Sequence, residues 1–250
     1  METWYTSLTD IAPNRVALRG RPLEELMGRL SFGGAVYLLF TGREADEDTA
    51  RFIDAILVSS IDHGVTPPSA LAARNAASTG APINASIASG VLAINRFHGG
   101  AIEGCMGVLK RVVELAAAEG LSPDEAADRV AAEEKAAKRR IPGYGHRVHT
   151  ADPRAARLLE LADELGQRGP GIEASEALGR AIERSLGRAL PLNVDGAIGA
   201  CLLDLGIDAA LANVFFIVAR VPGLAAHAHE ERSTQRPMRK IWPAAAEFKA

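Results

Sequence analysis

The sequence contains little cysteine. Only Cys105 and Cys201 occur among its 250 residues, and they stand in no CxxC or other ligand spacing. Two isolated thiols exclude a disulfide-stapled scaffold and fit a reducing compartment, so we expect a cytoplasmic protein. The first ten residues have no cationic start followed by an apolar stretch. We therefore expect no secretory signal.

An excess of one charge and long apolar runs are also missing. The sequence has 28 Lys and Arg residues against 31 Asp and Glu residues, a net charge of −3. This balance excludes the general basic field of a nucleic-acid-binding protein. The longest apolar runs, such as residues 214–219, fall well short of the roughly 20 residues that cross a bilayer. We therefore expect no nucleic acid and no membrane among its partners.

Aromatic residues make up 5% of the chain, and alternating β-branched runs are absent. The apolar periodicity is helical instead, which predicts an all-α fold. Two helices should start at Ser122-Pro123 and at Asp152-Pro153, because in each a capping residue precedes a proline at the first helical position. The periodicity predicts the other helices over residues 46–61, 83–96, 175–186, 193–205 and 211–219.

Histidines gather at the predicted helix ends and in glycine-bearing loops. One histidine alone is more often structural than catalytic, but this distribution is not that of core residues. Residues 141–147 contain Pro142 and two glycines and cannot continue a helix. Their backbone amides and Arg147 suit a phosphate or carboxylate, although an ordinary turn explains the pattern as well. The five histidines are His63, His98, His146, His227 and His229.

Three further patterns allow two interpretations each. Asp195 follows the predicted cap Asn193, where a carboxylate either stabilises the helix dipole or acts as a base. His227, His229 and Glu231 suggest a metal-dependent hydrolase, but the ligand spacing is not convincing and we predict no metal site. The C-terminal arginines form either a solvated face or a clamp for a di- or tricarboxylate. They are Arg220, Arg232, Arg236 and Arg239.

Taken in order, the motifs resemble the citrate synthase superfamily. The resemblance runs from about residue 19 to residue 241. The chain is short for this superfamily, and in this it is similar to citryl-CoA lyase and to the citrate-synthase-like domain of ATP citrate lyase. A fixed series of motifs is far more specific than any one of them. The series is Arg19-Gly20, Phe32-Gly33-Gly34, Asp62-His63, His98-Gly99-Gly100, Gly143-Tyr144-Gly145-His146-Arg147, Asp152-Pro153-Arg154, Asn193-Val194-Asp195-Gly196, Ala219-Arg220, Ala226-His227 and Arg236-Pro237.

The resemblance implies a multi-helical fold with a large and a small helical domain and an active-site cleft between them. We expect residues 1–110 and 191–250 to form the large domain and residues 111–190 the small domain, on the CoA side. It also implies a homodimer with shared active sites, or a larger assembly of such dimers. The implied ligands are an acyl-CoA and oxaloacetate or citrate-type carboxylates.

The resemblance assigns a role to each site residue. His98 would polarise the thioester carbonyl, Asp195 would move the proton at the α-carbon, and His146 would bond the keto or hydroxyl oxygen of the four-carbon partner. CoA, a substrate here, would lie against Gly143, Tyr144, Gly145 and Arg147, and no permanently bound cofactor is implied. The carboxylates would be held by His63, Arg154, Arg220 and Arg236, the last from the neighbouring subunit.

These residue types suit the chemistry, because a weakly acidic thioester α-proton needs both a base and a donor at the developing oxyanion. Chain length and the compact N-terminal part favour the reversible cleavage of citryl-CoA to acetyl-CoA and oxaloacetate. His98 in a His-Gly-Gly sequence favours condensation instead, so a compact citrate synthase or 2-methylcitrate synthase is the alternative. A noncatalytic CoA-ester-binding protein is disfavoured, because both His146 and Asp195 are present.

Overall fold

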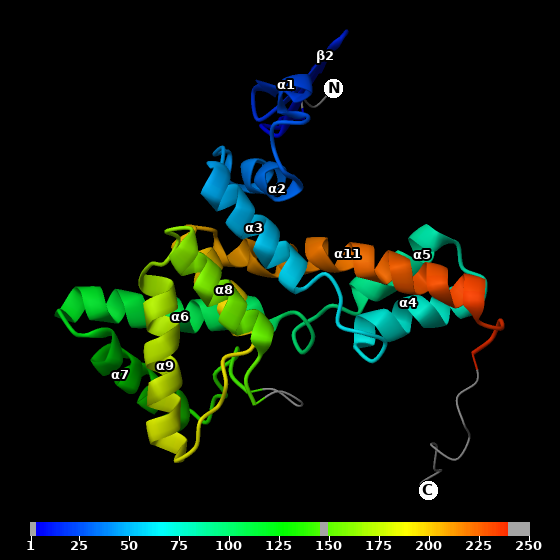
Figure 1. Cartoon of the computed structure of the whole chain (residues 1–250). Helices are drawn as coiled ribbons and strands as arrows, with labels where there is room; N and C mark the ends of the chain where they lie inside the picture. Colours follow the sequence, from blue (N-terminus) through cyan, green and yellow to red (C-terminus); the bar gives the residue numbers. More distant parts are fainter. Residues whose placement is uncertain (1–3, 146–149, 240–250) are drawn as a thin grey trace, which may run out of the picture. The chain divides into compact units, whose positions relative to one another are not determined.

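The computed structural model describes residues 4–145 and 150–239. Helices make up most of this part of the chain, as Figure 1 shows, which confirms the all-α prediction. In chain order they are α1 (Leu23–Leu26), α2 (Phe32–Thr41), α3 (Glu47–Ser59), α4 (Pro68–Ser78), α5 (Ile83–Leu92), α6 (Ala101–Glu119), α7 (Pro123–Ala136), α8 (Pro153–Glu164), α9 (Pro170–Leu186), α10 (Val194–Asp204) and α11 (Ala209–Thr234).

A small antiparallel sheet precedes the helices and was not predicted. Its strands are β1 (Thr9–Ala12), β2 (Arg15–Leu18) and β3 (Arg21–Pro22), in the order β1-β2-β3. Strands of two to four residues are too short to give a readable alternation, which is why the periodicity missed them. The Arg19 guanidinium donates to the Leu39 carbonyl over 2.7 and 3.0 Å, and this ties the sheet to α2.

The chain divides into two compact units, each built from two separate segments. Unit 1 comprises Met1–Ser59 and Ala101–Phe215, and unit 2 comprises Ser60–Gly100 and Phe216–Ala250. These boundaries are not those that we expected at residues 110 and 190. The division into a large domain and a small domain on the CoA side therefore stays a prediction.

Unit 1 holds closely packed helices with small residues at their interfaces. In it α6 packs on α10, and α7 packs on α9. An added Cβ on Gly199 of α10 would lie 3.1 Å from the Ile102 carbonyl of α6, so only glycine allows this approach without displacement. The start of α9 is held by Asp204, whose carboxylate accepts three backbone N–H groups over 2.6–3.0 Å. These hydrogen bonds satisfy backbone N–H groups that have no partner within the helix at its start.

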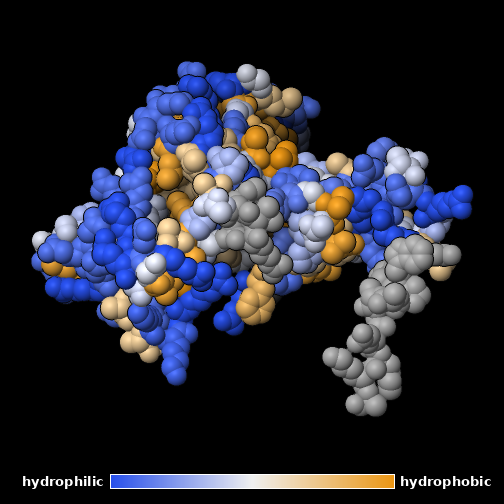
Figure 2. Space-filling view, turned by 60° about the horizontal axis from the view of Figure 1, so that its bottom comes forward, coloured by the Kyte–Doolittle hydropathy of each residue, from blue (hydrophilic) through white to orange (hydrophobic). Residues whose placement is uncertain are grey.

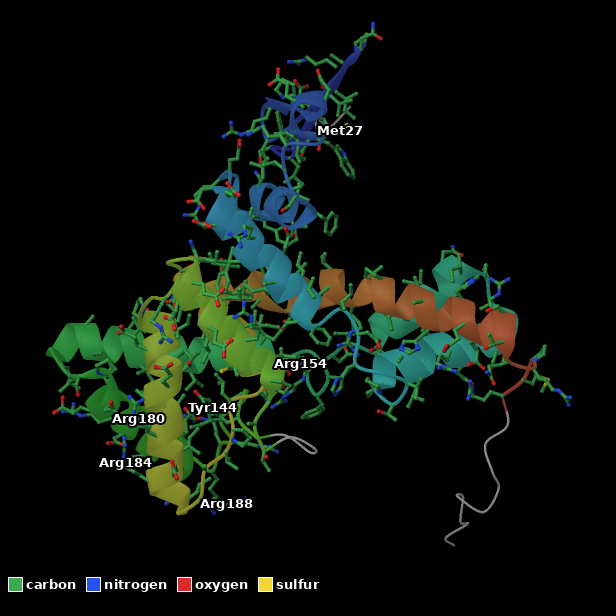
Figure 3. The ribbon with its side chains drawn as sticks, in the orientation of Figure 1. Met27, Tyr144, Arg154, Arg180, Arg184 and Arg188 are labelled. Atoms are coloured by element: carbon green, nitrogen blue, oxygen red, sulfur yellow. The ribbon has the colours of Figure 1, made fainter. Side chains whose placement is uncertain are left out.

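Helix ends follow the local signals in several places. Ser122 and Glu125 form the predicted capping box at the start of α7, and Asn193 caps α10 through a 3.1 Å bond from the Gly196 amide. Arg180 and Arg184 of α9, both labelled in Figure 3, pair with Asp124 and Asp128 of α7 across the packed faces. Such exposed pairs add little to stability.

Unit 2 is built from α4, α5 and the C-terminal part of α11. Figure 1 shows α4 and α5 beside that part of α11. A Cβ on Gly90 of α5 would meet Leu224 of α11 and the Ser69 carbonyl of α4, each at 2.9 Å. The three helices therefore approach one another closely at Gly90. Its replacement by any larger residue would push them apart.

The prediction of a short helix over residues 211–219 was wrong, because α11 continues through Pro222 to Thr234. Proline removes one backbone hydrogen bond, but Pro222 is exposed and the Ala-rich turns beyond it favour helix. By length and composition, α11 is the one helix of the described chain that could cross a membrane. Buried Arg220 and Glu231, both hydrogen-bonded inside unit 2, are instead typical of a core helix.

Large apolar side chains also lie on the surface. Figure 2 shows a face on which hydrophilic residues dominate and hydrophobic patches lie between them. Phe97 and Trp4 are 95% and 94% exposed, and Tyr5 and Leu92 are also largely exposed. Apolar side chains that gather on a surface mark places where another molecule docks.

Candidate active site

The start of α10 carries the predicted base. Asn193 is the N-cap, and Asp195 lies in the first turn, where the helix dipole favours a negative charge. The Asp195 side chain is half-buried, next to the start of α10 and within the electrostatic reach of the Cys105 thiol. Burial, with Asp195 as a second cause, raises the pKa of Cys105 to about 12. The Cys105 side chain near Asp195 is therefore an uncharged thiol.

The glycine loop of residues 143–145 is bonded to the segment just before α10. The Asn193 amide donates to the Gly143 carbonyl (3.0 Å), the Gly145 amide donates to the Pro191 carbonyl (2.7 Å), and the Asn193 side chain donates to the Gly145 carbonyl (2.9 Å). Three such hydrogen bonds over so few residues fix the position of the loop relative to the start of α10. The loop that precedes His146 is thus fixed relative to Asp195.

Glycine is required at the contact between this loop and α10. A Cβ on Gly143 would lie 2.5 Å from the Cys105 Sγ and 2.8 Å from the Gly196 Cα, and the φ of Gly143 is +84°. A Cβ on Gly196 would in turn lie 2.5 Å from the Gly143 carbonyl oxygen. Neither position has room for a side chain.

Tyr144, predicted to contact CoA, has its side chain in the core of unit 1. The residue is 2% exposed, and its hydroxyl donates to the Ser175 carbonyl over 2.7 Å. Burial raises the pKa of Tyr144 well above its usual value. A contact with CoA from this residue would have to come from its backbone. Figure 3 labels Tyr144 and Arg154, both of unit 1.

Asp152 connects Arg154 to the start of α10. Its carboxylate accepts bonds from the Arg154 Nε (3.0 Å), from a second guanidinium nitrogen (2.9 Å) and from the Val194 amide (3.1 Å). Burial acts to raise the pKa of Asp152, but the bonds from Arg154 and Val194 hold it below its usual value. The buried carboxylate therefore orients the guanidinium predicted to bind substrate and joins it to the helix that carries Asp195.

His98 lies in unit 2, in a tight turn at residues 95–98. The Asn95 and His98 backbones exchange two 2.8 Å hydrogen bonds, and an added Cβ on Gly99 would lie 2.7 Å from both Ile94 and Phe216. The His98 Nε2 and the buried Ser69 Oγ are 2.7 Å apart, and the Phe216 ring lies edge-on at 5.8 Å. Burial first, and then the charges of Arg220 and His63, lower the pKa of His98. These surroundings therefore favour the neutral form of the His98 imidazole over the charged form.

Arg220 of α11 is 2% exposed. Its Nε donates to the Ser60 carbonyl over 2.9 Å, and its guanidinium lies over the Phe216 ring at 4.7 Å. A backbone acceptor and an aromatic face hold a guanidinium in place at little entropic cost. Its charge reaches His98, so the two predicted site residues lie in one electrostatic environment.

His63 follows a turn that is attached to α11. The Asp62 carboxylate bonds the His227 Nε2 and accepts the Gly64 amide, each over 2.9 Å. A Cβ on Gly223 of α11 would lie 2.3 Å from the Ile61 carbonyl, so the turn sits directly on the helix. His63 itself is exposed. The role of His227 here is to hold the turn, which the sequence did not indicate.

The metal-dependent hydrolase is not supported by the geometry. His227 and His229 lie inside α11, not at a helix edge, and residues two apart on a helix point about 200° apart. His227 bonds Asp62, while Glu231 is held by Arg74 and Arg239. Within residues 4–145 and 150–239, no group of three His, Cys, Asp or Glu side chains is placed to hold a metal ion.

The structure therefore divides the predicted residues between the two units. Gly143, Tyr144, Gly145, Arg154 and Asp195 belong to unit 1, and His63, His98, Arg220 and Arg236 belong to unit 2. His146 and Arg147 lie outside the described residues. Sequence reasoning missed Ser69 and Asp152. An Asp-Pro start signalled Asp152 as a helix cap, but no local pattern signalled Ser69.

The geometry agrees with a comparison against known families. The model of the citrate synthase C-terminal domain matches residues 21–241. The chain belongs to the citrate synthase family. Among solved structures, citryl-CoA lyase from Hydrogenobacter thermophilus superposes with a TM-score of 0.91 at 39% identity, over 100% of this chain and 95% of the other.

Longer relatives match over part of their length. ATP citrate lyase from Methanothrix soehngenii, solved with citrate and coenzyme A, superposes with a TM-score of 0.83 at 26% identity, over 100% of this chain and 42% of the other. A probable ATP-citrate synthase of Dictyostelium discoideum is 28% identical over 92% of this chain. The chain spans 39% of the length of that relative. The citrate synthase family fold is thus common to separate lyases and to parts of larger enzymes.

We predict that His98 titrates below its usual pKa of 6.5, and that Arg220→Gln raises this pKa, because it removes a nearby positive charge. Since the folded-state pKa is the lower one, the neutral imidazole favours folding above about pH 6.5, and this contribution is lost as the pH falls through the folded-state pKa. An NMR titration of the His98 ring measures the pKa. Arg232→Gln, on an exposed arginine of the same helix, should leave it unchanged.

The two glycines of the loop give a second prediction. Gly145→Ala places a Cβ 3.6 Å from the Arg140 side chain, an ordinary contact, but at a φ of +87°, and should cost about 1–2 kcal/mol of unfolding free energy. Gly143→Ala adds the clash with Cys105 and Gly196, and should cost about 2–5 kcal/mol in total. Denaturant unfolding of both variants measures the difference. Equal losses would contradict the close approach that we describe.

Proposed function

We propose that this chain is a citryl-CoA lyase, which cleaves citryl-CoA to acetyl-CoA and oxaloacetate. The observation that carries the proposal is the 39% identity to the Hydrogenobacter thermophilus citryl-CoA lyase, extending over all of this chain and 95% of the other. The relationship is therefore between two chains of nearly equal extent. Citryl-CoA, the proposed substrate, is the product of a ligase-type reaction between citrate and coenzyme A.

The proposed mechanism assigns one step each to His146 and Asp195. His146 takes the proton of the citryl hydroxyl, and the bond between the carbinol carbon and the thioester α-carbon breaks. The electron pair passes to the thioester as an enolate, and Asp195 in its acid form delivers a proton to the α-carbon. One proton leaves oxygen and one arrives at carbon, so acetyl-CoA and oxaloacetate balance the citryl-CoA consumed.

The environment of His98 supports its role as a neutral donor to the enolate oxygen. Burial and the charges of Arg220 and His63 favour the neutral ring, which carries one N–H that can be donated to the enolate oxygen. Ser69 bonds Nε2, and the proposal assigns the other ring nitrogen, Nδ1, to the thioester oxygen. A fixed donor lowers the reorganisation needed as charge develops.

The arginines are proposed to orient the oxaloacetate part of the substrate. Arg154 is held by Asp152, and Arg220 by the Ser60 carbonyl and the Phe216 ring. Held guanidiniums bind carboxylates with defined geometry, which aligns the bond that breaks. His63 and Arg236 complete the proposed set. The backbone at Gly143 and Gly145, together with Arg147, is proposed to face CoA, with no permanently bound cofactor.

We also propose a homodimer in which Arg236 serves the neighbouring subunit, acting in the cytoplasm. Exposed apolar side chains such as Phe97 and Leu92 support self-association, because burial of these surfaces would be favourable. The two free cysteines are buried, which suits a reducing compartment. The expected mass in solution is that of two chains.

A compact citrate synthase or 2-methylcitrate synthase is the second candidate, and His98 in its His-Gly-Gly sequence is the observation that favours it. We expect purified protein to convert citryl-CoA mainly to acetyl-CoA and oxaloacetate, measured by chromatography of the CoA species and by coupled reduction of oxaloacetate. Citrate and free CoA as the dominant products would contradict the lyase and support the synthase.

Asp195→Asn should lower kcat for citryl-CoA cleavage by about 1,000-fold, because an amide cannot exchange the α-proton. The fold should be kept, since Asn still suits the first turn of a helix. Steady-state kinetics measures the loss, with circular dichroism as the check on folding. Asp48→Asn, a carboxylate in the first turn of α3, is the matched control and should keep wild-type kcat. Near-normal turnover of Asp195→Asn would refute the assigned role.

A further inference from the structure

The segment that follows α11, residues 235–239, is bonded back onto unit 2. The Met238 amide donates to the Ser78 carbonyl at the end of α4 over 2.7 Å. The Arg239 Nε donates to the Glu231 Oε1 over 2.9 Å, and a second guanidinium nitrogen bonds the Glu231 Oε2. The segment is thus attached to two helices at its C-terminal end.

Glu231 is the centre of these contacts. Its side chain is fully buried, and Arg74 of α4, 10% exposed, donates to its Oε2 over 2.8 Å through Nε. Arg74 also reaches Glu230 at 3.3 Å. The hydrogen bond from Arg239, stronger than the opposing effect of burial, leads the causes that lower the pKa of Glu231. One buried carboxylate therefore joins two guanidiniums from different parts of the chain.

A buried ion pair of this kind specifies a conformation more than it adds stability, because desolvation offsets much of the attraction. The conformation specified here is that of the segment. It is fixed at its start by the Gln235 amide, which donates to the Glu231 carbonyl over 3.2 Å, and at its end by Met238 and Arg239. Met238 has a left-handed φ of 56°, a backbone state that a non-glycine residue keeps only when its surroundings hold it.

Arg236 lies between these two attachments and is exposed, unlike Glu231. Pro237 follows it and restricts its backbone to extended conformations. Its backbone path is therefore determined by contacts that its own side chain does not make. A fixed backbone path increases the affinity of an arginine for a carboxylate, because the segment loses less conformational entropy when the ligand binds.

We propose that Glu231 and Arg74 are positioning residues for Arg236: they clamp residues 235–239 so that the Arg236 guanidinium is presented to a substrate carboxylate. The inference rests on the proposed function of Arg236 as a carboxylate ligand. Arg239 completes the clamp from within the segment. None of the three clamp residues needs to touch the substrate.

The test compares Glu231→Gln and Arg239→Ala with Arg236→Ala. Each variant should raise the KM for citryl-CoA and weaken citrate binding, measured by calorimetry, by about tenfold, with kcat changed less than twofold. The double variant Glu231→Gln/Arg236→Ala should be no worse than Arg236→Ala alone, because Glu231 acts through Arg236. Additive losses in the double variant overturn the proposal.

A matched control separates positioning from stability. Glu134 of α7 is also a buried glutamate held by two arginines, Arg111 and Arg139. Glu134→Gln should lower the unfolding midpoint to a similar degree as Glu231→Gln and leave citrate binding unchanged. If both variants weaken citrate binding equally, the effect is general destabilisation and the proposal fails. Arg239→Ala, on a partly exposed side chain, keeps the test open if Glu231→Gln does not fold.

Hydrogen exchange tests the clamp apart from the activity. The peptide containing the Met238 amide should exchange at least tenfold faster in Glu231→Gln than in wild type, read by mass spectrometry. Unchanged exchange overturns the clamp. If wild type does not cleave citryl-CoA but its citrate binding still depends on Glu231 and Arg236, the proposed lyase activity is refuted and the clamp is retained. Loss of the clamp without any change in citrate binding overturns the positioning role.

Discussion

The close approach of Gly143 to Gly196 is the contact on which the site in unit 1 depends. Two backbones meet there without side chains between them, and three hydrogen bonds between residues 143–145 and residues 191–193 hold the contact. The loop, the N-cap of α10 and Asp195 consequently share one local frame. A substitution that displaces any one of them would displace the others, because close-packed elements transmit displacements.

Three carboxylates, two of them buried and one half-buried, each join separate elements of the structure. Asp152 joins Arg154 to α10, Asp204 joins α10 to the start of α9, and Glu231 joins α4 to the C-terminal segment. Each accepts several donors from different elements, which an apolar side chain cannot do. Hydrophobic packing brings the helices together, and these carboxylates select one alignment among those that packing alone would allow.

The sequence predicted features whose cause is local. The capping box at Ser122 and the cap at Asn193 were confirmed, because a helix start is encoded within four residues. Partners distant in sequence could not be predicted. Ser69 and His98 are 29 residues apart, and Arg74 and Glu231 are 157 apart, so only the folded chain shows that they meet. The continuation of α11 through Pro222 was missed because the apolar run ends near Arg220, whereas the Ala-rich turns beyond Pro222 keep the chain helical.

The interleaving of the two units has a consequence for the order of folding. The chain leaves unit 1 at residue 59, returns at 101 and leaves again at 215. Unit 2 therefore lacks its third helix until α11 has been synthesised, and until then the close approach of Gly90 and Ser69 to Leu224 cannot form. Closing a loop of this length costs little more entropy than closing a shorter one, but it takes longer. The vulnerable period of this protein is the interval before α11 is complete, when a chaperone or a second nascent chain competes for the same surfaces.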